Sequence, residues 1–474
     1  MSRRGRFTIF LLLALPLGVA GFFLAGSLGE AGSLQRATSR VDAWVDAWAA
    51  TSSGAAPLPP NGVPAQILER VPSAGAGFVS ELRPVAAFPD SAALGDRSFI
   101  DRVEPPPGMS GVAGPLRVEY TMDVELTERV LTRLRSARSA RAHAIVLDVR
   151  SGRVLAYVST DSEAFPANRI YPAASIVKVI TTAAALEHAP KKARVPCRYQ
   201  GDPYRLKRSQ LRPRRAGHRS SLERSLALSN NQCFAQLAVN TVGEEAMLET
   251  LGRFGWLDSP APGHDSGSVD PVDDNFDLGR LGCGLAGCRI TPLHAAQLAA
   301  TLATGERIEP YWVDRVRDVE GRPLVLPPRP APVRVLSKKL AEQVRSMLVL
   351  TTTRGTAKSA FRNARGRPLL DNVKVAGKTG NLSGRNPRGR YEWFIGLAPA
   401  DDPMIAVAVL QVHDDLWFQR SSQIAAFILH DVFCKRSRCR AELASRYTGA
   451  LAAESIAPVL LTSASSPAGA RPRK

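Results

Sequence analysis

The pattern of apolar and polar positions predicts a chain of mixed α and β structure. Two apolar runs within residues 146–158 flank Ser151-Gly152, which predicts a hairpin of two strands. Later apolar runs predict adjacent antiparallel strands at 373–376, 393–398 and 405–412. Apolar segments of helical length predict helices at 176–186, 222–228, 290–304 and 423–433. The third of these helices opens with Thr291 and Pro292, the order expected of an N-cap residue and the first helical residue.

The N-terminal segment predicts a membrane anchor. Arginines at positions 3, 4 and 6 precede an apolar run over residues 7–25, which is near the ~20 residues that a spanning helix needs. Basic residues before such a run favour a cytoplasmic N-terminus and export of the rest. A cleaved signal peptide is the alternative, although its apolar core is usually only ~7–15 residues long. We expect residues 1–26 to be an anchor or signal segment. The rest of the chain would then lie in the periplasm or otherwise outside the cytoplasm, held at the inner (cytoplasmic) membrane.

Composition along the chain predicts one large folded part between two less regular segments. Residues 27–116 contain a stretch of helical spacing at 34–49 and then several prolines, which is typical of a stalk or linker with short ordered pieces. Residues 117–448 carry the predicted strands and helices. The tail at 449–474 is rich in Ala, Ser and Pro, and we expect it to be disordered.

The six cysteines are an even number, which in an exported chain favours disulfides. Two pairs are close in sequence, and a third pair flanks one of the motifs described below. The expected bridges are Cys283–Cys288 and Cys434–Cys439, with Cys197–Cys233 as a candidate third. A zinc site is the rival interpretation, but the spacing is not C-x-x-C and no pair of histidines accompanies it. Buried free thiols are the remaining alternative.

The net charge of +19 is concentrated in one segment. Its cations are Lys191, Lys192, Arg194, Arg198, Arg205, Lys207, Arg208, Arg212, Arg214, Arg215 and Arg219. Such a run is usually a solvated loop, but it would also favour an anionic cell-wall polymer or lipid headgroups. Nucleic acid is not an expected partner, because no binding motif is present and an exported protein rarely meets it.

Three short motifs occur in order and well separated along the chain. They are Ser175-Ile176-Val177-Lys178, Ser229-Asn230-Asn231 and Lys378-Thr379-Gly380. Each alone is too short to be specific, but together they match the S-x-x-K, S-x-N and K-T-G set of a serine acyl-transfer site. No metal or cofactor is expected, since neither H-E-x-x-H nor another ligand motif is present, and no G-x-S-x-G elbow indicates a different hydrolase.

With these motifs, the chain resembles the transpeptidase domain of penicillin-binding proteins. The resemblance covers roughly residues 117–435. Further matching segments are 117–123, 126–135, 144–148, 151–156, 290–299, 355–357 and 393–396. It implies an α+β fold of the penicillin-binding/β-lactamase-like kind, with an antiparallel sheet flanked by helices and a mostly helical subdomain.

The first two motifs would supply the nucleophile and its base. A serine hydroxyl needs a base, and Lys178 lies one helical turn after Ser175 among apolar neighbours, so burial should lower its pKa. By resemblance, Ser229 relays a proton toward the leaving amine, and Asn231 holds Lys178 and the substrate amide. Asn230, the middle residue, should point away.

The third motif would bind the substrate at a strand end. The resemblance implies that Lys378 and Thr379 bind the terminal carboxylate of a D-Ala-D-Ala stem and that Gly380 permits close approach. Lys378 would also be a second cation near the base. Backbone N–H groups of Ser175 and Asn381 would form the oxyanion hole.

Two departures from the family are visible. Asn381 stands where many members have Thr, a residue that shares carboxylate binding, and Ala174 precedes the nucleophile where Gly is frequent.

The expected function is cross-linking of peptidoglycan stem peptides by a D,D-transpeptidase that also binds β-lactams. A D,D-carboxypeptidase and a serine β-lactamase share the motifs. A penicillin-binding sensor or scaffold without turnover is the alternative from another class. Cell-wall synthesis proteins are further expected partners.

Overall fold

The computed structural model describes residues 82–88, 95, 97–105, 112, 114–326, 328–413, 418–435 and 438–448. The segment predicted as an anchor (1–26), most of the predicted stalk (27–116) and the predicted tail (449–474) lie outside the described residues. Among the helices of the described part, none has the length and apolar character needed to cross a membrane.

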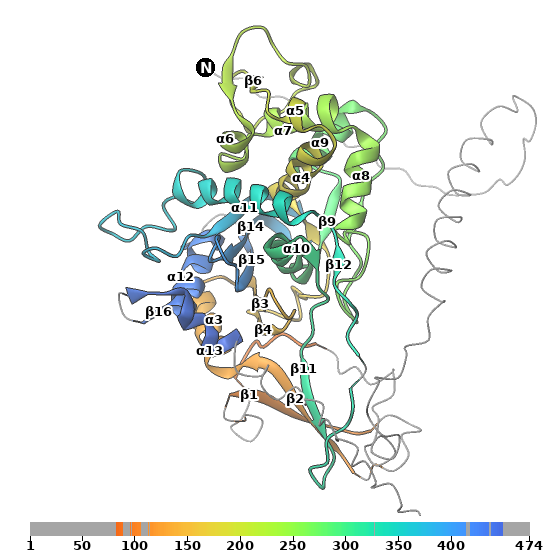
Figure 1. Ribbon diagram of the computed structural model, residues 1–474, viewed down its shortest axis with the longest axis vertical. Coiled ribbons are helices and arrows are strands. Elements are labelled where there is room, and N and C mark those ends of the chain that lie inside the picture. Colours follow the sequence, from red (N-terminus) through yellow and green to blue (C-terminus); the bar gives the residue numbers. More distant parts are fainter. Residues whose placement is uncertain are drawn as a thin grey trace, which may run out of the picture. The chain divides into compact units, whose positions relative to one another are not determined.

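A five-stranded antiparallel sheet lies at the centre of the described part (Figure 1). Its strands, in spatial order, are β13 (Ala376–Arg385), β14 (Arg388–Ala398), β15 (Ile405–His413), β3 (Arg141–Asp148) and β4 (Val154–Ser159). The predicted hairpin and the three adjacent antiparallel strands are therefore confirmed.

The predicted bounds of the first of these three strands are wrong. Residues 373–375 precede β13, which begins at Ala376 opposite Leu397 and continues to Arg385. The partner strand ends at Ala398 and is followed by Pro399, which has no N–H to donate to a ladder. The K-T-G motif thus lies inside the strand near its start, and not beyond its end.

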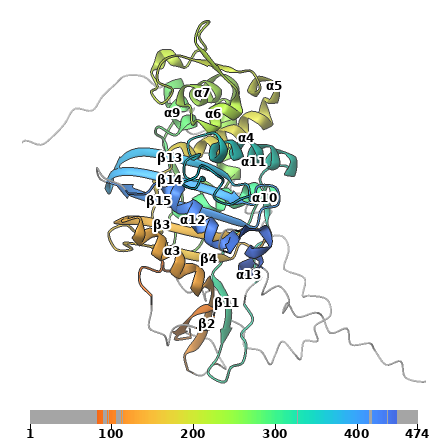
Figure 2. The same cartoon turned by 90° about the vertical axis from the view of Figure 1, so that its left-hand side faces the viewer.

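Both faces of the sheet are covered by helices, as Figure 2 shows. Helices α3 (Val124–Ser136) and α12 (Ser421–Phe433) pack on one face, and α10 (Pro292–Thr304) packs on the other. Every residue of β15 is buried, which explains its continuous apolar run. Successive side chains of this strand alternate between two separate hydrophobic clusters, as the two-residue period of a strand requires.

A mostly helical subdomain carries the first two motifs, as predicted. Its helices are α4 (Lys178–His188), α5 (Pro190–Ala193), α6 (Leu222–Ala227), α7 (Asn231–Leu237), α8 (Glu244–Arg253) and α9 (Asn275–Cys283). Helix α11 (Lys338–Thr353) packs against both α6 and β13. The predicted helix at 176–186 needs a correction, because residues Ala174–Val177 form a 3₁₀ turn and the α-helix begins at Lys178. Similarly, Cys288–Ile290 form strand β9, so α10 begins at Pro292 with Thr291 as its N-cap.

Smaller sheets complete the described part. Strands β1 (Ser98–Val103), β2 (Leu116–Asp123) and β11 (Val313–Arg317) form one sheet in the order β1-β2-β11. The segment Ser98–Val103, within the predicted stalk, is thus paired to the strand that opens the predicted catalytic part. Two short ladders join β5 (Tyr171–Pro172) and β8 (Ser268–Val269) to β9, and another joins β6 (Cys197–Tyr199) to β7 (His218–Ser220).

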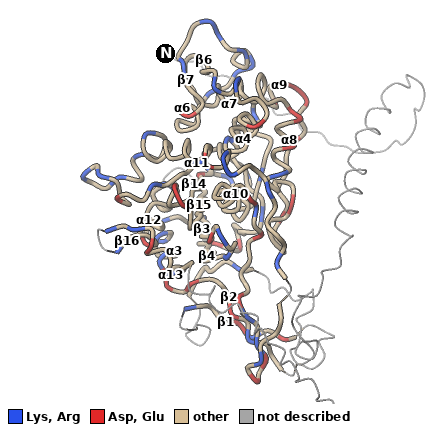
Figure 3. Tube along the Cα trace, in the orientation of Figure 1, with Lys and Arg blue, Asp and Glu red and all other residues tan. Residues whose placement is uncertain are grey.

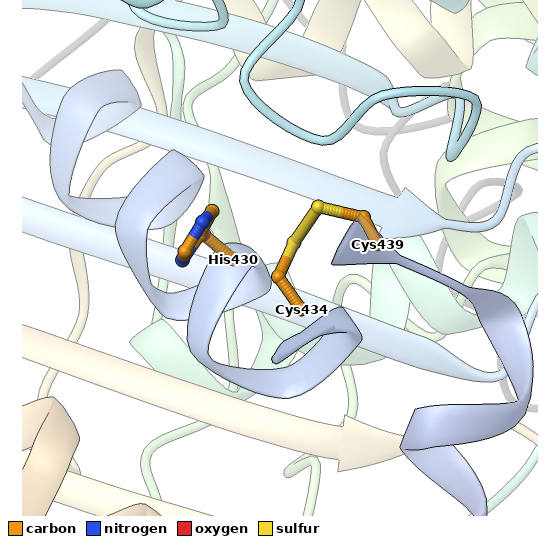
Figure 4. Close-up of side chains that lie close together, drawn as sticks. All are labelled: His430, Cys434 and Cys439. Carbon is orange, nitrogen blue, oxygen red and sulfur yellow. A yellow bond between two sulfur atoms is a disulfide. The ribbon is translucent and has the colours of Figure 1, made fainter. Parts of the chain in front are cut away.

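Two of the three expected disulfides are present, namely Cys197–Cys233 and Cys434–Cys439. The second joins β16 (Cys434–Lys435) to β17 (Arg438–Cys439) at the end of α12. Figure 4 shows His430 beside this bridge. The imidazole and the two sulfurs lie within 4.8 Å of one another, but both sulfurs are already joined to each other.

The expected Cys283–Cys288 bridge is wrong, because both residues are buried free thiols. Cys283 is the last residue of α9, and its thiol donates to the carbonyl oxygen of Arg280 at 3.5 Å. The chain then turns through the left-handed Gly284 before Cys288 pairs with Val269 in the β8–β9 ladder. The helix cap and the ladder hold the two cysteines in separate elements.

Candidate active site

The candidate nucleophile, Ser175, lies in the 3₁₀ turn before α4. Ala174 has a φ of 50°, in the left-handed region that favours glycine. The alanine that stands here, where the family often has glycine, therefore occupies a strained backbone position. Two glycines pack against this turn. A Cβ on Gly284 would lie 2.1 Å from the carbonyl oxygen of Ala174, and one on Gly380 would lie 3.3 Å from its Cβ. The surrounding backbone therefore fixes the turn.

Lys178 lies behind the nucleophile and is fully buried. Its Nζ donates to Ser175 Oγ at 2.6 Å and to Asn231 Oδ1 at 2.6 Å, and it lies 3.3 Å from Ser229 Oγ. Burial lowers the pKa of Lys178 from 10.5 to about 8. A neutral amine so close to a hydroxyl can accept its proton, which is the chemistry a serine nucleophile needs.

Ser229 and Asn231 lie on either side of the turn between α6 and α7. Ser229 has a φ of 55°, and this left-handed residue turns the chain between the two helices. Asn230 caps α7, with its side chain accepting from the N–H of Cys233 at 3.0 Å, so it does not enter the site. Asn231 accepts from Lys178 and donates its Nδ2 to the carbonyl oxygen of Tyr204 at 2.7 Å.

Lys378 is the second buried lysine of the site and has no exposed surface. Its Nζ donates to Ser229 Oγ at 2.9 Å and to the carbonyl oxygen of Thr379 at 2.7 Å. Burial, and then the charge of Lys178, hold the pKa of Lys378 well below its ordinary value. Lys378 is thus buried behind Ser229. Its influence on a bound substrate would pass through the Ser229 hydroxyl.

The remaining residues of the third motif lie on the edge strand β13. Because side chains alternate along a strand, Thr379 and Asn381 share one face and Gly380 the other. Thr379 Oγ1 lies 2.6 Å from Thr356 Oγ1, and Asn381 Oδ1 accepts from Arg390 Nε at 2.6 Å. The edge position leaves the strand open to the addition of an extended peptide.

A groove of about 330 Å³ joins the three motifs. It is lined by Ser175, Ser229, Asn231, Thr379, Gly380 and Asn381, together with Tyr204, Leu285, Thr356, Arg390, Glu392, Arg420 and Ser422. The structure therefore brings together residues that lie more than two hundred positions apart in sequence. A larger cavity of about 370 Å³ is lined by strands β1 and β2 and by five arginines, but it contains no motif residue.

The sequence did not identify most of the groove residues that lie outside the three motifs and Asn381. Thr356 had a signal, since it lies in the Gly355-Thr356-Ala357 match. Tyr204 had none, because its place at the groove depends on the fold of its loop, in which its carbonyl oxygen accepts from Asn231. Arg390 and Glu392 are placed by the β13–β14 register, which the sequence does not show.

Comparison with known proteins agrees with this geometry. The model of the "Penicillin binding protein transpeptidase domain" family matches residues 142–433. The chain belongs to the penicillin-binding protein transpeptidase family. The fold expected from the resemblance is thereby confirmed.

Two mycobacterial penicillin-binding proteins illustrate the relationship. Peptidoglycan D,D-transpeptidase PbpA of Mycolicibacterium smegmatis is 30% identical over 253 residues, covering 51% of this chain and 49% of that protein. Penicillin-binding protein PbpB of the same organism is 26% identical over 332 residues, covering 62% of this chain and 50% of that protein. The chain therefore spans about half the length of these relatives.

Solved penicillin-binding protein structures share the fold. The imipenem acyl-enzyme complex of penicillin-binding protein A from Mycobacterium tuberculosis superposes with a TM-score of 0.55 at 24% identity, over 66% of this chain and 78% of that chain. The D,D-transpeptidase domain from Eggerthella lenta gives 0.56 at 21% identity, over 68% and 85%.

Proposed function

We propose that this protein is a serine D,D-transpeptidase that cross-links D-Ala-D-Ala stem peptides of peptidoglycan through an acyl-serine intermediate. The observation that carries the proposal is the position of Lys178 Nζ, 2.6 Å from both Ser175 Oγ and Asn231 Oδ1, together with a pKa lowered to about 8. The family membership and the D,D-transpeptidase names of its relatives support the same reaction.

In the acylation step, Ser175 Oγ attacks the carbonyl carbon of the penultimate D-Ala while its proton passes to the neutral amine of Lys178. The C–N bond of the amide then breaks. The proton on Lys178 passes through Ser229, whose hydroxyl contacts both Lys178 and Lys378, to the nitrogen of the leaving D-Ala, and Lys178 becomes neutral again. The product is an ester between the stem and Ser175.

In the second step, the amine of another stem attacks this ester. A new amide bond forms, the ester C–O bond to Ser175 breaks, the amine loses a proton to Lys178, and that proton returns to Ser175 Oγ. In a carboxypeptidase, water would take the place of the amine. The chemistry is otherwise the same, and the two activities differ in whether the groove admits an acceptor amine or only water.

Substrate binding would use the edge strand. The stem would extend β13 by backbone hydrogen bonds, with its terminal carboxylate at Thr379 and Asn381 and with Lys378 behind them, bound to the carbonyl oxygen of Thr379. A side chain on Gly380 would press on both Trp393 and Ala174, so glycine at this position keeps the strand close to the turn that carries Ser175. Backbone N–H groups of Ser175 and Asn381 would stabilise the oxyanion. β-Lactams would bind as mimics of the same amide.

The proposal extends to the arrangement of the chain. Residues 1–26 would anchor it in the cytoplasmic membrane, 27–116 would link the anchor to the transpeptidase domain at 117–448, and 449–474 would be a tail. The basic residues and apolar run at the N-terminus support this placement. Cell-wall synthesis proteins would be its partners.

One assay tests the activity. The purified protein is incubated with a pentapeptide stem, with and without an amine acceptor, and the products are read by mass spectrometry. A transpeptidase gives the cross-linked amide when the acceptor is present, whereas a carboxypeptidase gives only the tetrapeptide. A sensor would acylate with penicillin but release neither product, and rapid hydrolysis of penicillin would indicate a β-lactamase.

A further inference from the structure

The strongest concentration of charge in the described part lies on the segment between α5 and α6, here called the basic loop (residues 194–221). Figure 3 shows its lysines and arginines gathered around β6 and β7. Together with two lysines of α5, it accounts for eleven cations, and the only carboxylate within it is Asp202. Arg205 pairs with Asp202 at 3.6 Å and Arg208 pairs with Asp274. Across residues 191–219, all of which are described, the other nine cations have no carboxylate partner.

The basic loop is held in place despite its charge. The Cys197–Cys233 disulfide ties it to α7. Two glutamines of α7 also bind its backbone. Gln232 Nε2 donates to the carbonyl oxygens of Gln200 and Asp202, both at 2.8 Å, and Gln236 Nε2 donates to those of Arg198 and Gln210 at 3.0 and 2.9 Å. A fixed array of cations loses little conformational entropy when it binds a partner.

The same loop forms one wall of the groove. The backbone N–H of Asn231 donates to the carbonyl oxygen of Pro203 at 2.8 Å, and its side chain donates to that of Tyr204. Tyr204 lines the groove and is 52% exposed. The cations that follow it, Arg205 and Lys207, are exposed as well. A long anionic molecule lying along the loop would therefore pass the mouth of the groove.

The basic loop lies at one end of the described part. In both views, helices α6 and α7 lie at the opposite end of the described part from strands β2 and β11 (Figures 1 and 2). Ser229 and Asn231 of the groove lie at the turn between α6 and α7, so a molecule bound along the loop is also close to the groove.

We propose that the basic loop is a docking surface for the peptidoglycan strand that carries the stem peptides. Each uncross-linked stem ends in a carboxylate, so a strand that bears many stems presents many carboxylates to the cations of the loop. The loop binds neighbouring stems of the strand and keeps one of them at the groove. This assignment rests on the proposed function, because that function makes the strand the substrate.

Two matched variants of the full chain test the proposal. Arg212→Gln, Arg214→Gln and Arg215→Gln together remove three exposed cations of the basic loop. Lys358→Gln, Arg365→Gln and Arg367→Gln together remove three exposed cations after α11. The net charge changes equally in both. The probe is insoluble, uncross-linked peptidoglycan, and bound protein is measured by co-sedimentation at low and high salt.

We expect the basic-loop variant to bind the strand roughly tenfold more weakly at low salt, the combined effect of three exposed ion pairs of ordinary strength. The control variant should bind like the wild type, and high salt should remove the difference. Equal losses in both variants, or no loss in the basic-loop variant, would overturn the proposal. So would tighter binding to vesicles containing anionic phospholipid, lost in the same variant, since that result would identify a lipid surface.

A second readout separates this proposal from the proposed function. The basic-loop variant should react with penicillin at the wild-type rate, because none of its substituted residues lines the groove. Strand binding can also be measured with Ser175→Ala, which cannot acylate. A wild-type protein that binds the strand but never reacts with penicillin would refute the transpeptidase and leave the docking surface standing.

Discussion

Lys178 and Lys378, two buried lysines from motifs two hundred residues apart, share a single hydroxyl. Ser229 Oγ lies 3.3 Å from the first Nζ and 2.9 Å from the second. Two ammonium groups cannot both stay charged so close together without cost, and neither has a carboxylate partner among the described residues. Burial favours the neutral amine of Lys178 next to Ser175, where the proposed acylation requires one.

The rate of acylation by penicillin should therefore rise with pH and level off above an apparent pKa near 8. A lysine is a base only when neutral, and since burial lowers the pKa of Lys178 to about 8, its neutral fraction increases as pH rises through that value. The measurement is the second-order acylation rate from pH 6 to pH 10, with a folding check at each end. In Lys178→Met the rising limb of this pH profile should vanish, and the acylation rate should fall by roughly 10²–10⁴-fold. A flat profile in the wild type would contradict this role.

Lys378→Met should leave that limb at nearly the same pH. Burial, and not the charge of Lys378, lowers the pKa of Lys178, whereas the pKa of Lys378 is lowered by burial and then by the charge of Lys178. The same pH series measures the position of the limb. Lys374→Met is the matched control, because Lys374 is exposed and pairs with Asp401 at 3.1 Å outside the site. A limb that moves to higher pH in Lys378→Met alone would show that the charge of Lys378 also disfavours protonation of Lys178.

The Asn381 side chain should discriminate a substrate carboxylate. Its Oδ1 accepts from Arg390, so its Nδ2 is the end left to donate. Asn381→Asp keeps the acceptor for Arg390 but replaces the donor with a negative charge. We expect the preference for a stem with a free carboxylate over its amidated form to fall by roughly tenfold or more. Asn381→Ala should show a smaller loss. An unchanged preference in the Asp variant would place the carboxylate elsewhere.

The two disulfides should differ in their contribution to stability. Cys197–Cys233 spans 36 residues and Cys434–Cys439 spans five, and a longer closed loop restricts the unfolded chain more. Replacing the first pair by serine should cost about 2–4 kcal/mol in the free energy of unfolding, with a smaller loss for the second pair. Denaturant titration measures both. Without reductant, Cys283 and Cys288 should be alkylated only on unfolding, and their recovery as a disulfide-linked peptide would contradict the structure.

Sequence patterns predicted the elements better than they predicted their ends. The strands over residues 393–398 and 405–412 carry long apolar runs that are buried on both faces, so their pattern was unambiguous. The start of β13 depends on Pro399, which follows the end of the neighbouring strand, and the 3₁₀ turn at Ser175 depends on packing against Gly284 and Gly380. These are contacts between distant segments, which a local pattern does not contain.

The motifs likewise specified which residues meet but not how they meet. S-x-x-K spacing on one helical turn predicted the contact between Ser175 and Lys178. The full burial of Lys378 and its contact with Ser229 follow from the sheet register and from the turn between α6 and α7. The contact of Tyr204 with Asn231 depends on the fold of the basic loop, for which the sequence showed only charge.

Covalent labelling by a fluorescent penicillin tests most directly whether Ser175 is the nucleophile. The β-lactam amide is attacked in place of the stem, and the opened ring remains as an ester on the nucleophile. We expect stoichiometric labelling of the wild type, with the added mass on the peptide containing Ser175, and no labelling of a folded Ser175→Ala variant. Labelling that persists in Ser175→Ala, or mass found on another residue, would contradict this assignment of the nucleophile.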